Sequence, residues 1–352
     1  MKTINKIIHT NKLLYLFAVA GALLFPLMAS AHEVYVLSNG EISNDLLYAP
    51  INLFAVALSH EYQFLTAAFL GALLIFCVLG ISLLHGLGRH LDPFLIKIKP
   101  YAAHIAQITI GLALIASAYY GALFGTELPF TKLFPNYTQL VTIALYVSGG
   151  CILFGVFPRF GSVLAILLFI WSIFTGEGTY MLSYLTYFGE SLVILLFGAG
   201  YSLFSYTPTF SGSTKKFFTA LERRKHFIMR ICFSTSLIYA ALYAKLIHGE
   251  LALNTVMKYH LTNFFPFDPL FIVLGAFLIE MSIGLFFLIG FEIRFTALFF
   301  LAFLTMSLFF FGESVWPHII LIGTAITLFV HGYDEFTVEK IWYKKGKSEP
   351  VL

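Results

Sequence analysis

The sequence predicts an all-α polytopic membrane protein, and three observations lead to this class. Of the 352 residues, 59% are apolar and only 11% are charged, whereas soluble domains contain about 25% charged residues. Many of the apolar residues form runs of about the length that a membrane-spanning helix needs. The Lys and Arg residues lie in short clusters between these runs. This composition excludes a soluble enzyme. The net charge of +3 reflects orientation in a lipid bilayer, without a nucleic-acid partner.

The N-terminus has the features of a secretory signal peptide. Basic residues precede an apolar stretch at 13–28, and Ala29-Ser30-Ala31 then supplies the small residues that signal peptidase cleaves. We expect residues 1–31 to be removed, which makes His32 the first residue of the mature chain. Residues 32–60 are then an exported segment. The alternative is an uncleaved signal anchor.

About nine mature spans follow the exported segment. A leading span and an inner loop are expected in 61–100. Four spans are expected in 101–205 and four in 227–336, separated by a cytoplasmic linker at 206–226 that is rich in Ser, Thr and basic residues. The expected spans are 64–84, 105–124, 140–157, 161–174, 184–203, 227–246, 270–289, 295–311 and 317–330.

The distribution of positive charge predicts the orientation. The loops on one side and the tail at 337–352 carry most Lys and Arg residues, whereas the loops on the other side carry only Lys132 and Lys258. By the positive-inside rule, the mature N-terminus lies outside and the C-terminus lies in the cytoplasm. This arrangement agrees with an odd number of mature spans and predicts a bacterial-type inner membrane location.

The two four-span blocks resemble each other in the order of their landmarks. A tight inner turn at 155–160 has a counterpart at 290–295, and both blocks close on a Gly-Tyr pair that begins at Gly200 or Gly332. An even number of spans in each block makes the two copies parallel. We therefore expect a tandem repeat with a pseudo-twofold axis along the membrane normal.

Several short motifs of the second block occur in the order typical of a known family. They are Arg230 and Lys245 in the first span, Leu278–Gly284 in the second, the turn Gly290–Arg294, and Gly332–Val338 at the end. On these motifs, residues 228–338 resemble the DoxX superfamily of four-helix membrane proteins, with a degenerate second copy at 101–205. The first block departs from the pattern, because Gln107 and Ala122 stand near where Arg230 and Lys245 would align.

The resemblance implies a fold and a functional context. Namesakes of the family are small membrane subunits associated with quinol oxidase and thiosulfate:quinone oxidoreductase systems. The resemblance therefore implies an inner-membrane subunit or accessory of a quinone-linked redox system. Quinone is the implied cofactor, and the implied partners are other membrane redox subunits. Whether the chain itself catalyses a reaction stays open, because a fold alone does not fix a function.

Ionisable residues inside the spans are the candidate catalytic residues, because each costs about 2.5–3.5 kcal/mol at the bilayer centre. Glu280, near the middle of its span, is either a proton-carrying or quinone-contacting carboxyl or a neutral acid that hydrogen-bonds between helices. Lys245 lies about one turn from the outer end of its span, where a snorkelling lysine is the alternative. Arg230 lies at an inner end, where pairing with headgroups or closing the inner turn is the alternative.

Acidic and histidine residues gather at the outer ends of the spans, where we expect them to line a polar mouth. The candidate ligand-binding residues are Glu190, His248, Glu250, Glu313 and His318. The alternative is that these side chains are simply solvated. We interpret the phenylalanine stripes, which include Phe299, Phe300, Phe303 and Phe309–Phe311, as lipid-facing or core side chains.

A metal site is the second functional hypothesis. A processed chain would begin at His32 and would offer an amine and an imidazole, a pair that suits copper. The protein would then handle copper, or transport a small solute through the polar mouth. A third hypothesis is a membrane scaffold without chemistry of its own.

Overall fold

The computed structural model describes residues 51–84, 86–198, 224–311 and 314–343, together with Gly200 and Glu222. This part of the chain is helical, and it contains no strand. The all-α class is therefore confirmed. The expected signal peptide, most of the exported segment and most of the linker at 206–226 lie outside the described residues.

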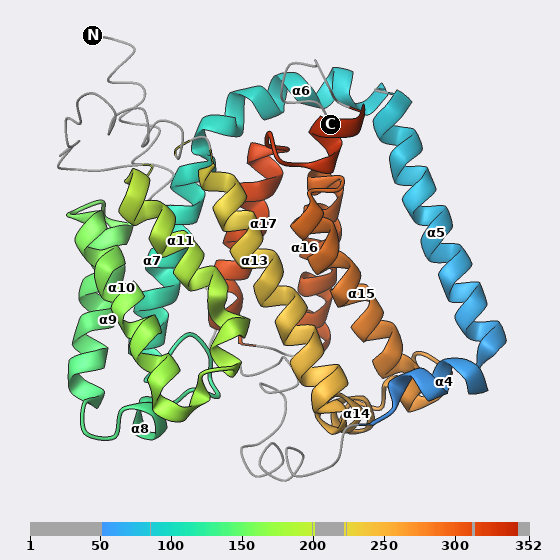
Figure 1. Ribbon diagram of the computed structural model, residues 1–352, viewed down its shortest axis with the longest axis horizontal. Helices are drawn as coiled ribbons and strands as arrows, with labels where there is room; N and C mark the ends of the chain where they lie inside the picture. Colours follow the sequence, from blue (N-terminus) through green and yellow to red (C-terminus); the bar gives the residue numbers. More distant parts are fainter. Residues whose placement is uncertain are drawn as a thin grey trace.

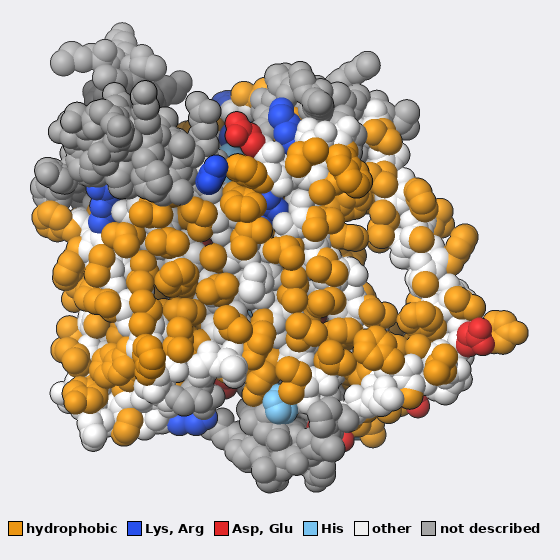
Figure 2. All heavy atoms as spheres, viewed as in Figure 1, with side chains coloured by type: hydrophobic (Ala, Val, Ile, Leu, Met, Phe, Trp, Pro, Cys, Tyr) orange, Lys and Arg blue, Asp and Glu red, His pale blue; other side chains and the backbone are white. Residues whose placement is uncertain are grey.

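Seven helices of the described part are long and apolar enough to cross a membrane. They are Glu61–Leu83, Leu91–Tyr120, Pro158–Thr175, Tyr180–Phe197, Lys225–Ile247, Pro269–Ile289 and Ile293–Phe311. Two more apolar helices, Thr138–Leu153 and Trp316–His331, are shorter than a straight span needs. Each expected span overlaps one of these helices. Figure 2 shows a broad band of hydrophobic side chains, with most charged side chains near the two ends of the bundle. The chain is therefore a multi-pass membrane protein.

Eight helices form two blocks of four. The first block consists of α7 (Ala102–Tyr120), α9 (Thr138–Leu153), α10 (Pro158–Ser172) and α11 (Leu185–Phe197). The second consists of α13 (Lys225–Ala241), α15 (Pro269–Ile289), α16 (Ile293–Phe311) and α17 (Ile319–His331). Consecutive helices pack together within each block. Between the blocks, α7 packs against α17 and α11 packs against α13 (Figure 1). The first helix of each block thus lies against the last helix of the other.

A glycine allows close packing at each of these two seams. On α17, a Cβ at Gly323 would overlap Thr109 of α7. On α11, a Cβ at Gly189 would overlap Cys232 of α13. Small residues let helix backbones approach closely in membranes, where packing contacts replace the hydrophobic effect as the force between helices.

The corresponding turns of the two blocks, at 155–160 and 290–295, share a backbone conformation. Gly155 and Phe157 have φ angles of 67° and 53°, and Gly290 and Glu292 have φ angles of 70° and 42°. A positive φ is uncommon for a residue other than glycine, so the match at Phe157 and Glu292 is specific. The helix that closes the first block ends at Gly198, with φ 83°, and the one that closes the second ends at Gly332, with φ 80°. The counterpart of Gly332 in backbone conformation is therefore Gly198, and not Gly200.

The leading helices lie beside the two blocks. Helix α4 (Leu53–Ser59) packs against α15, and α5 (Glu61–Leu84) stands apart from the bundle in Figure 1. Helix α6 (Gly86–Ile98) runs across one end of the bundle, where the sequence led us to expect a loop. Its apolar residues Leu91, Phe94, Leu95 and Ile98 recur at helical spacing, so this basic segment forms an amphipathic helix despite Pro93.

The remaining helices identify the two ends of the bundle. The α6 end carries α6 and the turns after α9 and α15. The α14 end carries the short helices α8 (Phe130–Leu133) and α14 (Gly249–Lys258) (Figure 1). Aromatic rings gather at the α14 end, where Tyr120 stacks on Trp316 with ring centroids 5.2 Å apart. Tyr and Trp are typical of the membrane–water interface.

Candidate functional site

The second block contains a large cavity toward the α14 end. Its volume is about 940 Å³, at the upper end of the range typical of small-molecule sites. Helices α15 and α16 diverge toward this end in Figure 1, and both contribute to the cavity wall. The lining residues Met306 and Phe309 are exposed on the outside of the bundle. The cavity therefore reaches the lateral surface, which faces lipid in a membrane.

The cavity wall is mainly aromatic. Its phenylalanines are Phe264, Phe265, Phe267, Phe271, Phe300, Phe303, Phe309, Phe310 and Phe311. The interpretation of the phenylalanine stripe as lipid-facing or core was incomplete, because several of these rings line the cavity. Such a wall suits a lipophilic ligand and gives a flat ring many stacking partners.

An ion pair between two predicted site residues lies in this wall. Lys245 Nζ is 2.9 Å from Glu280 Oε2, and the two side chains are 2% and 19% exposed. An unpaired charge in this apolar setting would be costly. Each residue therefore lowers the free-energy cost of burying the charge of the other. The sequence identified both residues as candidates, and the fold brings them together.

Local backbone geometry positions Lys245. The α13 helix continues into a π-helical turn, Leu242–Ile247. A π-helical turn inserts an extra residue and changes which side chains share a face, and such turns occur frequently at functional sites. Lys245 lies within this turn and pairs with Glu280 on α15. The lysine is therefore buried inside the block and does not snorkel to the interface.

The pair offers both kinds of hydrogen-bonding group to a ligand. The ammonium group donates and the carboxylate accepts, and the two charges cancel overall. Hydrogen bonds that involve a charged group are about twice as strong as neutral ones. The surrounding low dielectric strengthens them further. The site can therefore orient a polar headgroup that carries an acceptor and a donor.

His318 is the third predicted residue in the cavity wall. It is buried at the start of α17, and its Nδ1 is 2.9 Å from the Ser314 carbonyl oxygen. Of the predicted ligand-binding residues that are described, His318 alone lines this cavity.

The other predicted mouth residues lie elsewhere. Glu190 is buried between α11 and α17, where it accepts a hydrogen bond from the Thr324 hydroxyl. His248 and Glu250 are half-buried at the start of α14, and burial lowers the pKa of His248. Glu313 lies outside the described residues. The expected polar mouth is therefore not one cluster among the described residues.

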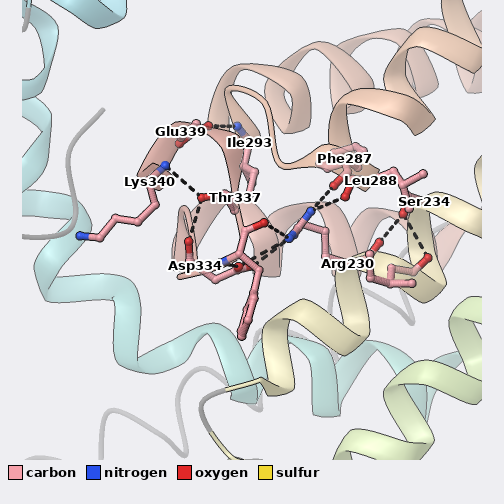
Figure 3. A network of polar contacts seen from close by, with 11 residues as sticks. Arg230, Ser234, Phe287, Leu288, Ile293, Asp334, Thr337, Glu339 and Lys340 are labelled. Atoms are coloured by element: carbon pink, nitrogen blue, oxygen red, sulfur yellow. Dashed lines mark hydrogen bonds and ion pairs between the residues drawn. The ribbon is translucent and has the colours of Figure 1, made fainter. Parts of the chain in front are cut away.

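Arg230 belongs to a separate network at the α6 end (Figure 3). Its Nε is 3.1 Å from Asp334 Oδ2, and its Nη1 donates to the carbonyl oxygens of Phe287 and Leu288 at 2.7 Å each. The last carbonyl groups of a helix have no partner within that helix, so Arg230 satisfies two of them at the end of α15. Its position matches the alternative that this arginine closes the inner turn.

The network contains residues that the sequence did not identify. Asp334 pairs with Arg230 and also accepts a hydrogen bond from the Phe336 backbone N–H. Glu339 accepts one from the Ile293 backbone N–H at the start of α16 (Figure 3). Both acids lie in or beside the motif Gly332–Val338, which was the only signal for them.

The copper hypothesis depends on His32, which lies outside the described residues. Within the part of the chain that the structure describes, no group of three or more His, Cys, Asp and Glu side chains could hold a metal ion. In comparisons with known proteins, no family model, curated protein or solved structure matches this chain.

Proposed function

We propose that the cavity in the second block binds a lipophilic molecule with a polar ring, and that a quinone is the class that fits best. The observation that supports this proposal is the Lys245–Glu280 ion pair in the wall of an aromatic cavity that reaches the lateral surface. A ligand dissolved in the bilayer could enter through this lateral opening without crossing water.

The chemistry of a quinone complements the wall. A quinone carbonyl oxygen accepts a hydrogen bond from Lys245 Nζ, and a quinol hydroxyl donates one to Glu280. The ring packs against phenylalanine side chains such as Phe300 and Phe303. An isoprenoid tail would leave past Met306 into lipid. A free fatty acid or an anionic phospholipid fits less well, because its negative headgroup would be repelled by Glu280 as much as it is attracted by Lys245.

We further propose that residues 228–338 form a DoxX-like unit and that 101–205 is its degenerate copy. The matched φ angles at the two inner turns, the glycine at each seam and the reciprocal packing of α7 with α17 and α11 with α13 support this duplication. On the family resemblance, the protein is a subunit or accessory of a quinone-linked redox system.

The proposed orientation places the α14 end outside. Most of the described Lys and Arg residues belong to elements at the α6 end, among them Lys99, Arg159, Lys225 and Arg294. The α14 end carries Lys132 and Lys258. By the positive-inside rule, the α6 end is cytoplasmic in an inner membrane.

Titration of the purified protein with decylubiquinone tests the proposal. We expect saturable binding that weakens about tenfold or more in Lys245→Met and in Glu280→Gln, because each variant loses a hydrogen bond to a charged group. Lys258→Met and Glu250→Gln are matched controls, since neither residue lines the cavity.

The double variant Lys245→Met/Glu280→Gln is the control for misfolding. It removes both charges, so neither charge is left unpaired. We expect it to fold and to bind decylubiquinone as weakly as the single variants. Wild-type protein that takes up no quinone, or a Lys245→Met variant that binds as well as wild type, would contradict the proposed function.

A further inference from the structure

A second, smaller cavity lies between the two blocks. Its volume is about 50 Å³, which is room for more than one water molecule. Polar side chains from both blocks face it, among them Ser183, Thr186 and Tyr187 from the first block and Ser236 and Tyr243 from the second. The wall is thus more polar than that of the large cavity and is formed by both copies of the fold.

Two hydroxyl groups in this wall have no hydrogen-bond partner within the part of the chain that the structure describes. Thr186 Oγ1 and Ser183 Oγ are buried and form no hydrogen bond with the described residues. Buried polar groups are nearly always hydrogen-bonded, and ordered water usually supplies the bond when the protein does not. The size of the cavity and its unsatisfied hydroxyls therefore indicate bound water.

Two tyrosines connect this cavity toward the α14 end. Tyr180 and Tyr184 both line it, and the hydroxyl groups of both donate hydrogen bonds to Glu127 Oε1. Glu127 lies in the loop between α7 and α8 and is half-buried. The two hydroxyl groups and the carboxylate therefore form a polar connection between the cavity and the loop between α7 and α8.

The small and large cavities share a wall of four residues, namely Leu237, Ala240, His318 and Leu321. Of these, His318 alone has a side chain that can accept and release a proton. Its Nδ1 must carry the hydrogen in the contact with the Ser314 carbonyl oxygen, because a carbonyl oxygen can only accept. Nε2 is then the ring nitrogen that can take up a proton.

We propose that the small cavity is a water chamber and that His318 passes protons between this water and the occupant of the Lys245–Glu280 cavity. A proton that leaves a hydroxyl group of the occupant bonds to His318 Nε2, and the resulting imidazolium then releases the proton to water. No electron moves in this step. The relay rests on the proposed function, because that function supplies the occupant of the large cavity. The water chamber does not depend on the proposed function.

Silver ion tests the chamber, because Ag⁺ is about as small as a water molecule and binds thiols tightly. The chain is reconstituted in proteoliposomes after its three native cysteines are changed to alanine. We expect Ag⁺ to protect Thr186→Cys and Ser183→Cys from later labelling with maleimide. The control is Ala113→Cys, a fully buried position outside both cavities. If Ag⁺ protects neither Thr186→Cys nor Ser183→Cys more than it protects the control, the proposal of a water chamber is overturned.

A nitrophenol with a decyl chain tests the relay, because its absorbance reports its own protonation. At saturating probe, we expect the bound probe to deprotonate at least tenfold more slowly after a pH jump in His318→Gln than in wild type. His248→Gln is the control, since His248 lines neither cavity.

The two arms fail in different ways. An unchanged rate in His318→Gln would overturn the relay. If the probe does not bind, or if it binds equally well to Lys245→Met, the proposed function is overturned and the relay with it. The silver experiment would in that case still decide whether the chamber holds water.

Discussion

Lys245 and Glu280, on consecutive long helices of the second block, form an ion pair with 2.9 Å between Nζ and Oε2. The lysine side chain is almost fully buried, and the glutamate side chain is half-buried. Because an unpaired charge is costly in an apolar bundle, the pair favours contact between α15 and the π-helical turn that follows α13. It also leaves one strong donor and one strong acceptor in the wall of the large cavity.

Breaking the pair should destabilise the protein. Glu280→Gln leaves the Lys245 ammonium without its counter-charge, and we expect a loss of about 1–3 kcal/mol, less than for a fully buried pair because Glu280 retains some solvent contact. The double variant Lys245→Met/Glu280→Gln should recover most of that loss. Thermal unfolding in detergent measures both values. Equal melting temperatures for wild type, single variant and double variant would show that the pair contributes nothing.

Arg230 should matter for stability and not for ligand binding. Arg230→Lys cannot contact Asp334 and two carbonyl oxygens with the same geometry. We expect a loss of about 1–3 kcal/mol, because lysine keeps the positive charge beside Asp334 and leaves buried acceptors without a donor. Arg159→Lys, at the corresponding turn of the first block, should change stability by less than about 0.5 kcal/mol. Decylubiquinone affinity of the folded Arg230→Lys protein should equal that of wild type. A weakened affinity at unchanged stability would assign Arg230 to the binding site.

The seam between α7 and α17 should tolerate no side chain at Gly323. Gly323→Ala places a methyl group against Thr109, and we expect destabilisation by about 1–3 kcal/mol from overpacking. Gly150→Ala on α9 is the matched control, because an added Cβ there meets open space. The control should be neutral or slightly stabilising, since alanine favours helix more than glycine does. Equal effects at the two glycines would refute close packing at this seam.

A bulky side chain should block the large cavity without touching the ion pair. Gly275 lines the cavity, and nothing lies within 4 Å of a Cβ built there. We expect Gly275→Phe to weaken decylubiquinone binding about tenfold or more while thermal stability stays near that of wild type. Gly150→Phe, which faces open space away from the cavity, should bind normally. Undiminished binding by Gly275→Phe would place the ligand elsewhere.

Hydrophobic patterning was sufficient to predict the all-α class and the positions of the seven long apolar helices of the described residues, because membrane-spanning helices need long apolar runs. It also identified Lys245 and Glu280, because ionisable residues are rare in such runs. Their pairing could not be predicted from spacing, since it depends on the π-helical turn at Leu242–Ile247. That turn changes the direction of Lys245 relative to a regular helix.

Other features depend on contacts between distant segments. Glu190 was expected at an outer mouth, but the packing of α11 near α17 buries it against Thr324. Asp334 was part of a recognised motif, and only the fold places it beside Arg230. Helix α6 was missed because the Lys and Arg residues between two spans were interpreted as an inner loop, whereas the apolar spacing of the segment favoured an amphipathic helix.

Native mass spectrometry of the protein, released directly from its membrane, tests the central claim most directly. The account predicts one quinone bound to each wild-type chain and none bound to the Lys245→Met/Glu280→Gln double variant. The same spectrum reports whether the chain begins at His32 and whether it carries copper. A wild-type chain without quinone, or equal quinone occupancy in the double variant, would contradict the account.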